Sequence, residues 1–282
     1  MTQDLWHEGR PKALTLFGMS GLGKTHIAKL LRHDAGWFHY SIDYRIATRY
    51  MGALIEDDLK EQAMALPKLR ELLLLDAITV RSKVSFDNLA PMSAYLGKPG
   101  DSAKNGFAYD AYMARQEQFR QAEVAALMDT GHFKARAKTL YNNPFFVCDT
   151  GGSVCEHVDP EDPSDPILTH LAAHSVLVWI KGDDSHVDAL IERFNKAPKP
   201  MYYPPAYLAE RWATYGAQVE PNPAKVDPDH FVRWVYADAI KMRQPKYAAM
   251  AKHWGVAIGA VDLANCAHPQ DVLDLVKAAH DA

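Results

Sequence analysis

The sequence predicts a doubly wound α/β protein, in which helices cover both faces of a mainly parallel sheet. Three observations favour this fold class. A glycine-rich loop stands between a short apolar run and a helical pattern, and apolar runs then alternate with helical patterns along the chain. The apolar runs also lack an alternation of polar and apolar residues, which is typical of parallel strands buried on both faces.

The first predicted strand is Ala13–Phe17, and the loop that follows it, Gly18–Thr25, has the sequence GMSGLGKT. This loop fits the phosphate-binding pattern GxxxxGK[ST] at every fixed position. A helical pattern begins at His26, so backbone N–H groups and the positive end of the helix dipole would point at a polyphosphate. Lys24 would contact the β and γ phosphates, and the Thr25 hydroxyl would bind Mg²⁺. We therefore expect a nucleoside triphosphate site here.

The remaining elements complete the alternating pattern. Strands are predicted at 37–42, 145–148, 175–180 and 256–258, and helices at 26–31, 44–50, 59–64, 69–80, 110–128, 184–194, 208–218, 231–254 and 271–279. Residues 91–106 are rich in Gly, Pro and Ser and are expected to form a loop, as is 197–205. Pro245 is expected to interrupt the helix in which it lies.

One domain is expected for the whole chain, residues 1–282. Its core would comprise about 1–50, 141–221 and 258–282, and two helical insertions would lie at about 51–140 and 222–257. In the second insertion, the basic residues are interpreted as a solvated helix face: Arg233, Lys241, Arg243 and Lys246.

Composition excludes several classes of protein. The 31 basic and 35 acidic residues give a formal net charge of −4, which argues against nucleic acid as a partner. No apolar stretch approaches the roughly 18 residues of a membrane helix, and Met1–Arg10 lacks a signal-peptide core. The three cysteines, Cys148, Cys155 and Cys266, are interpreted as free thiols. We expect a cytoplasmic monomer or homodimer.

Polar residues follow the predicted strands at the sheet edge where ligands bind in this fold class. Asp149 comes directly after the third strand and could hold Mg²⁺ through water, although a turn cap would also explain an Asp there. Gly151 and Gly152 would let a backbone approach a ligand closely, or would form a plain tight turn. Asp43 follows the second strand and is either a catalytic carboxylate or a helix N-cap.

Seven segments resemble, in the same chain order, motifs of shikimate kinase and related small-molecule kinases. They are the loop Gly18–Thr25, then Ile42–Ile46 (IDYRI, against DxDxxI), Phe119–Glu123 (FRQAE, against FRxxE), Thr150–Ser153 (against a triple glycine), Pro198–Met201 (against the RPLL lid), Leu208–Tyr215 (against LxxRxxxY) and Asn265–Pro269 (against the adenine loop). The resemblance covers the expected core. It implies a three-layer P-loop NTPase sandwich with an enlarged helical substrate-binding and lid region.

The resemblance also implies roles for individual residues. Asp43 would receive the acceptor hydroxyl, Arg120 and Arg211 would grip an anionic substituent, and Lys199 would be the lid cation. Gly151 and Gly152 would line the acceptor site. We assign the nucleotide, ATP with Mg²⁺, to a set of nine residues: Gly18, Ser20, Gly21, Gly23, Lys24, Thr25, His26, Arg193 and Asn265.

The sequence also departs from the pattern of that family. Ser41 replaces the first Asp of the DxD segment, Ser153 replaces the third glycine, and a lysine, Lys199 or Lys196, replaces the lid arginine. A lysine neutralises a phosphoryl group as a point charge without bidentate geometry. The region between the second and third strands is much longer than a shikimate kinase requires, so we expect a different acceptor.

These observations predict an enzyme, an ATP-dependent phosphotransferase acting on a hydroxyl of a small, anionic metabolite. Positioning and charge neutralisation supply most of the rate in phosphoryl transfer, which suits the lysines, arginines and carboxylates singled out above. Two alternatives stay open. One is a nucleotide or nucleoside kinase that uses the first insertion to hold a base. The other is an ATP-binding switch that acts on a protein partner through the helical insertions.

Overall fold

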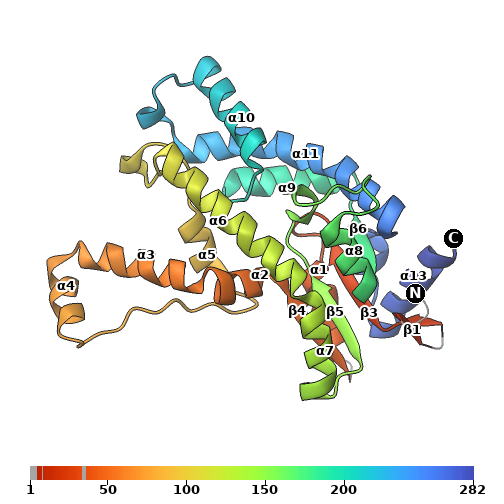
Figure 1. Ribbon diagram of the computed structural model, residues 1–282. Coiled ribbons are helices and arrows are strands. Elements are labelled where there is room, and N and C mark those ends of the chain that lie inside the picture. The colour runs from red at the N-terminus through yellow and green to blue at the C-terminus, as the bar shows by residue number, and fades with distance from the viewer. Residues whose placement is uncertain (1–4, 8, 34–35) are drawn as a thin grey trace. The chain divides into compact units, whose positions relative to one another are not determined.

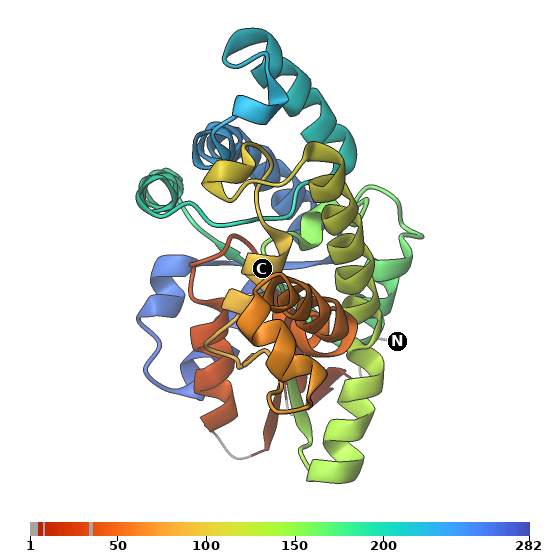
Figure 2. The same ribbon diagram turned by 90° about the vertical axis from the view of Figure 1, so that its left-hand side faces the viewer.

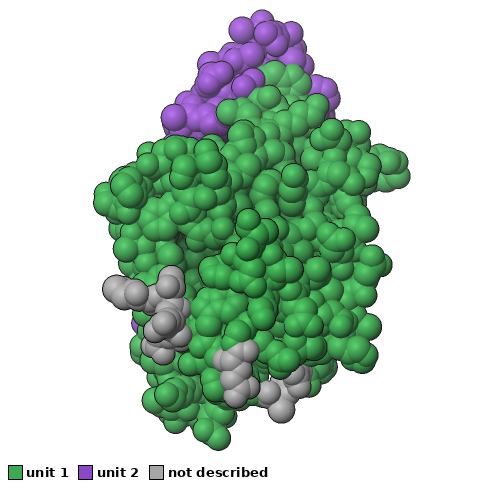
Figure 3. All heavy atoms as spheres, turned by 90° about the vertical axis from the view of Figure 1, so that its right-hand side faces the viewer, with its two compact units in different colours: residues 1–42, 124–198, 233–282 green, residues 43–123, 199–232 purple. Residues whose placement is uncertain are grey.

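The computed structural model describes residues 5–7, 9–33 and 36–282, so the predicted N-terminal segment Met1–Arg10 lies partly outside the described residues. The chain divides into two compact units (Figure 3). Unit 1 comprises Met1–Ile42, Val124–Pro198 and Arg233–Ala282, and unit 2 comprises Asp43–Glu123 and Lys199–Val232.

A five-stranded sheet organises unit 1, and all of its neighbouring strands are parallel (Figure 1). The strand order is β4-β5-β3-β6-β7. The bounds are β3 (Ala13–Phe17), β4 (Trp37–Ser41), β5 (Phe145–Asp149), β6 (Val176–Lys181) and β7 (Gly255–Gly259). A short antiparallel pair, β1 (Trp6–His7) and β2 (Arg10–Pro11), precedes them. The first long strand lies at the centre and the chain crosses to both sides, so the predicted doubly wound α/β class is confirmed.

Helices cover both faces of this sheet. On one face α1 (Lys24–His33) contacts α13 (Pro269–Asp281), and on the other α7 (Thr130–Tyr141) contacts α8 (Pro166–His174). Because α1 and α7 both contact β4 and β5, they must lie on opposite faces, which gives three layers. All five side chains of β3 are buried, as expected for a central parallel strand. Unit 1 also contains η4 (Val154–Glu156), α9 (Asp184–Lys196) and α12 (Ala260–Ala264).

Unit 2 is helical. It contains η2 (Ile46–Tyr50), α3 (Gly52–Met64), α4 (Pro67–Leu74), α5 (Ala90–Leu96), η3 (Ser102–Lys104), α10 (Pro205–Gln218) and η5 (Pro223–Lys225). Helix α3 contacts both α4 and α5 (Figure 2). Three helices carry the chain from one unit to the other: α2 (Ile42–Arg45), α6 (Tyr109–Met128) and α11 (Pro228–Trp254). Among the described residues, no helix is both long and apolar enough to cross a membrane.

Salt bridges and a backbone hydrogen bond hold the two chain segments of unit 2 together. Lys98 pairs with Asp229 at 2.5 Å, Lys104 pairs with Asp227 at 2.8 Å, and the Asp101 N–H donates to the Val226 carbonyl. Residues 43–123 and 199–232 therefore form one folded body, although some 75 residues of chain separate them. The division into a core and two insertions stays a prediction.

Two predictions that depend on proline are wrong. The expected loop 91–106 begins with a helix, α5, in which Pro91 lies in the first turn, where a missing N–H removes no hydrogen bond. The helix ends at Leu96, and the φ of 64° at the capping residue Gly97 favours glycine. Helix α11 runs through Pro245 without interruption. Tertiary packing of its buried face offsets the roughly 3 kcal/mol that an interior proline costs.

Candidate functional site

The phosphate-loop pattern lies between β3 and α1, as predicted. Gly18, Gly21 and Gly23 have φ angles of 132°, 90° and 92°, a region that other residues rarely adopt. A Cβ atom on Gly18 would lie 2.7 Å from the Ile180 carbonyl oxygen of the neighbouring strand. The glycines at these positions are therefore required by backbone geometry and close packing.

Lys24 is the first residue of α1 and is only 6% exposed. Its Nζ donates hydrogen bonds to the carbonyl oxygens of Gly18 (2.9 Å) and Met19 (2.8 Å). A buried ammonium group needs such partners, and they hold the charge inside the loop. Ser20 and His26, from the loop and the start of α1, are exposed. The loop therefore places one cation at a helix N-terminus, where anions bind.

Asp149 ends β5, and its place in the sheet register brings it level with Leu16 of β3 and Ser41 of β4. Its Oδ2 accepts a hydrogen bond of 2.7 Å from the Thr25 hydroxyl, and His39 Nε2 lies 3.8 Å from the same oxygen. A carboxylate and a hydroxyl are hard oxygen ligands of the kind that Mg²⁺ prefers. Mg²⁺ usually takes few protein ligands and completes its shell with water and phosphate oxygens. The predicted pair Thr25 and Asp149 is thus adjacent and fits that metal.

The turn after β5 lies against the phosphate loop. A Cβ atom on Gly152 would lie 2.6 Å from the Ser20 hydroxyl and 3.2 Å from the Ser20 nitrogen. Gly151 is buried and Gly152 is half-buried. The predicted glycine turn and the loop residue Ser20 are therefore in direct contact within unit 1.

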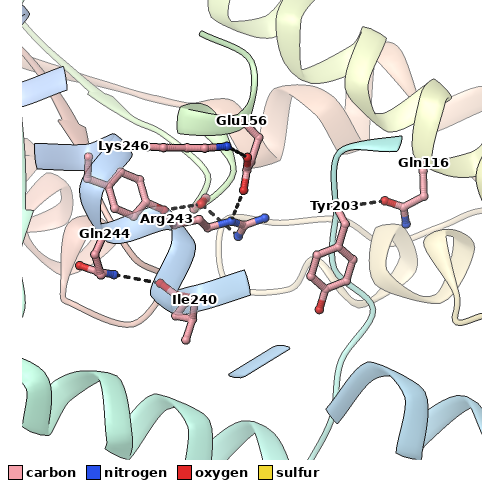
Figure 4. A network of polar contacts seen from close by, with 9 residues as sticks. Gln116, Glu156, Tyr203, Ile240, Arg243, Gln244 and Lys246 are labelled. Carbon is pink, nitrogen blue, oxygen red and sulfur yellow. Dashed lines mark hydrogen bonds and ion pairs between the residues drawn. The ribbon is translucent and has the colours of Figure 1, made fainter. Parts of the chain in front are cut away.

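An ion-pair network that the sequence analysis did not predict fixes this turn (Figure 4). Arg243 and Tyr247 of α11 both donate to the Gly152 carbonyl oxygen, Arg243 at 3.2 Å. Arg243 Nε also donates to Glu156 Oε1 at 2.9 Å, and Lys246 pairs with the other Glu156 oxygen. Burial alone would raise the pKa of Glu156, but Arg243 and Lys246 outweigh it and lower that pKa. The network joins a helix of the predicted second insertion to the β5 turn.

The interpretation of the basic residues of α11 as a solvated face is therefore wrong for Arg243, which is 2% exposed. The sequence does contain a pattern that indicates burial of Arg243. Tyr236, Ile240, Tyr247 and Met250 recur at helical spacing and are all buried, and Arg243 lies on the same face. An arginine on an otherwise apolar stripe indicates a buried partner, which is here the Glu156 carboxylate.

Two other predicted nucleotide residues also lie in unit 1. The side chain of Arg193, from α9, covers the loop at Gly21, where a Cβ atom would lie 2.2 Å from the Arg193 Nη2. Asn265 is exposed directly after α12. The following loop is held by Asp271, whose Oδ2 accepts from the Ala267 and His268 backbone N–H groups.

The other predicted acceptor-site residues lie in unit 2. Asp43 is the second residue of α2, and Lys199 is exposed in the segment before α10. Arg120 pairs with Glu117 through two hydrogen bonds of 2.8 and 2.7 Å, which hold the pKa of Glu117 at about 2. The Arg211 guanidinium lies 5.1 Å from the centre of the Tyr207 ring. Lys196, the other lid candidate, ends α9 in unit 1 and bonds to an exposed Glu192.

Gln116 of α6 is hydrogen-bonded to the backbone of the segment that contains Lys199. Its amide nitrogen donates to the Met201 carbonyl at 3.2 Å. Its amide oxygen accepts from the Tyr203 N–H at 3.0 Å (Figure 4). The rings of Phe119 and Tyr202 stack at 5.6 Å beside it. Gln116 itself has no exposed surface. Helix α6, which carries Arg120, and the segment after Lys199 are thus fixed together within unit 2.

We expect Gln116→Ala to lower the free energy of unfolding by about 1–3 kcal/mol, because a buried N–H and a carbonyl lose their partner. Urea denaturation measures this loss. Gln121→Ala, on an exposed face of the same helix, is the matched control and should change stability by about 0.5 kcal/mol or less. Equal losses of unfolding free energy in the two variants would contradict a stabilising role for the Gln116 hydrogen bonds.

The fold and loop together define a class: α/β proteins with a central parallel sheet and a phosphate loop after the central strand. No protein-family model matches the chain, and no curated protein matches it. Among solved structures, the fold is similar to a shikimate kinase from Bacteroides thetaiotaomicron, with a TM-score of 0.42 and 14% identity over 96% of this chain and 98% of that chain. It is also similar to a shikimate kinase from Aquifex aeolicus, with a TM-score of 0.28 and 13% identity over 82% and 97% of the chains. This similarity, at low sequence identity, concerns the fold alone.

Proposed function

We propose that the protein is an ATP-dependent kinase that phosphorylates a hydroxyl of a small, anionic metabolite other than shikimate. The observation that carries this proposal lies in unit 1. Lys24 is held inside the phosphate loop, and the next residue, Thr25, bonds to the strand-end carboxylate Asp149 at 2.7 Å. A lysine, a hydroxyl and a carboxylate in this arrangement support binding of a nucleoside triphosphate with its metal.

The nucleotide would be held by unit 1. Backbone N–H groups from Gly18 to Gly23, including those of Ser20 and Gly21, would bind the phosphates, and Lys24 would offset their charge. Thr25 and Asp149 would hold Mg²⁺, which when bound offsets further charge on the β and γ phosphates. His26, Arg193 and Asn265 would complete the nucleotide site.

A second set of residues would hold the acceptor. Asp43 would orient the acceptor hydroxyl and accept its proton as the new oxygen–phosphorus bond forms and the bond from the γ-phosphorus to the departing ADP breaks. Lys199 would offset charge on the transferring group, while Arg120 and Arg211 would hold the anionic substituent. Gly151 and Gly152 would offer backbone N–H groups. The four charged residues of this set all belong to unit 2, so unit 2 would be the main determinant of acceptor choice.

Acceptor-dependent ADP release from Mg-ATP, measured across a panel of hydroxylated carboxylates and sugar phosphates that includes shikimate, tests the proposal. We expect at least one acceptor other than shikimate to stimulate ADP release. Stimulation by nucleosides or nucleotides alone would indicate the nucleoside kinase alternative. Stimulation by a protein partner but by no small molecule would overturn the proposal in favour of a nucleotide-dependent switch.

A further inference from the structure

Unit 2 contains a cluster of aromatic side chains whose polar ends are buried. Tyr109 of α6 stacks on Trp212 of α10 with ring centres 4.7 Å apart. Tyr203 lies 6.1 Å from Tyr207, and Tyr207 carries the Arg211 guanidinium over its ring. The cluster thus joins the first turns of α6 to α10, and all of its members belong to one compact unit.

Two hydroxyl groups of the cluster have no hydrogen-bond partner among the residues that the structure describes. They belong to Tyr109 and Tyr112, and both oxygens are buried. Tyr112 has no exposed surface at all. Buried polar groups in folded proteins are almost always hydrogen-bonded, because leaving water without a new partner costs free energy. Two such groups in one cluster therefore need an explanation.

Tyr109 and Tyr112 lie three residues apart on α6, so their side chains are neighbours on one face of that helix. Burial raises the pKa of Tyr112 well above its usual value, and the neighbouring Tyr203 and Tyr109 raise it further. The Gln116 side chain opposes that rise, and its amide also bonds to the Met201 and Tyr203 backbone. Phenylalanine would fill the same volume at 109 and 112 without burying a hydroxyl. The hydroxyls are therefore costly for folding and suited to a ligand that supplies acceptors.

We propose that unit 2 holds a binding site for a small oxyanion, a carboxylate or a phosphate group, which accepts hydrogen bonds from the hydroxyls of Tyr109 and Tyr112. Arg211 of the same cluster, whose guanidinium lies 5.1 Å from the centre of the Tyr207 ring, would supply the positive charge that an anion requires. This inference rests on the proposed function in one respect: it takes the anionic group of the phosphate acceptor to be the natural ligand of the site. Binding itself needs neither ATP nor catalysis.

The test compares the thermal stability of the whole chain with and without two probes, acetate and inorganic phosphate. The phosphate arm uses a Lys24→Ala background, so that the phosphate loop does not contribute. We expect acetate, phosphate or both to raise the melting temperature. We expect Tyr112→Phe and Tyr109→Phe to be at least as stable as their parent without a probe, since each removes an unpaired buried hydroxyl. Each should bind the probe about tenfold more weakly or worse in calorimetry.

Tyr95→Phe is the matched control. Tyr95 is also a buried tyrosine of unit 2, but its hydroxyl donates to Gln118 Oε1 at 2.6 Å. Its loss should lower stability and leave the probe response unchanged. The site is refuted if neither probe stabilises the native chain, if Tyr112→Phe keeps the full response, or if Tyr112→Phe loses stability as Tyr95→Phe does. If probe binding follows these expectations while no ATP-dependent transfer occurs, the site stands and the kinase proposal fails.

Discussion

Lys24→Met is expected to lower the rate of phosphoryl transfer about a thousandfold or more, the size of effect seen when a group that stabilises transition-state charge is removed. The Lys24 ammonium is buried in the loop and bonded to the Gly18 and Met19 carbonyls. Methionine keeps the length of the side chain and removes its charge. Steady-state ADP release with a stimulating acceptor measures the loss.

Lys29→Met is the control for this experiment, because Lys29 lies on the same helix, α1, and is only half-buried. It should leave the rate within about twofold, since surface changes away from a site have small effects. Circular dichroism should show the same fold in both variants. Turnover by Lys24→Met within tenfold of the native rate would contradict the role of the phosphate loop.

Arg243→Met is expected to lower the free energy of unfolding by about 3 kcal/mol, because it leaves the Glu156 carboxylate buried without its main partner. The side chains of Arg243 and Glu156 are only 2% and 6% exposed. The double variant Arg243→Met with Glu156→Gln should recover most of the loss, since no buried charge remains. Urea denaturation measures both. Lys241→Met, on the exposed face of α11, should change stability by about 0.5 kcal/mol or less.

The same network gives the stability a pH dependence with a defined sign. The pKa of Glu156 is lower in the folded protein than its ordinary value of 4.5. The folded state therefore binds the Glu156 proton less tightly than the unfolded state. The stabilisation that the ionised Glu156 contributes is complete above the unfolded pKa of 4.5, and it is lost as the pH falls through the lower pKa of the folded state. This acid-side loss should be smaller in Arg243→Met. If Arg243→Met alone proves as stable as the double variant with Glu156→Gln, the ion-pair account is contradicted.

Much of unit 1 could be predicted from the sequence because its signals are local. The strand, loop and helix around Gly18–Thr25 are contiguous, and the apolar runs that form β5 and β6 are unbroken. The contact between Thr25 and Asp149 follows from the same logic, since parallel strands end at one edge of the sheet.

The features that the sequence analysis missed depend on tertiary contacts. Arg243 is buried only because Glu156 and the Gly152 carbonyl, about ninety residues away, accept its hydrogen bonds. Helix α11 continues through Pro245 because its packed face holds it, and local propensity alone predicts a break. The pairing of Gln116 with Met201 and Tyr203 likewise joins segments that share no sequence pattern.

The identity of the phosphorylated product tests the central claim most directly. Phosphorus NMR of a reaction containing the protein, Mg-ATP and the acceptor that stimulates ADP release distinguishes transfer to a hydroxyl from transfer to water. We expect a phosphomonoester signal that grows in step with ADP and is absent with Lys24→Met. Inorganic phosphate as the only product would contradict the claim and identify the protein as a nucleotide hydrolase.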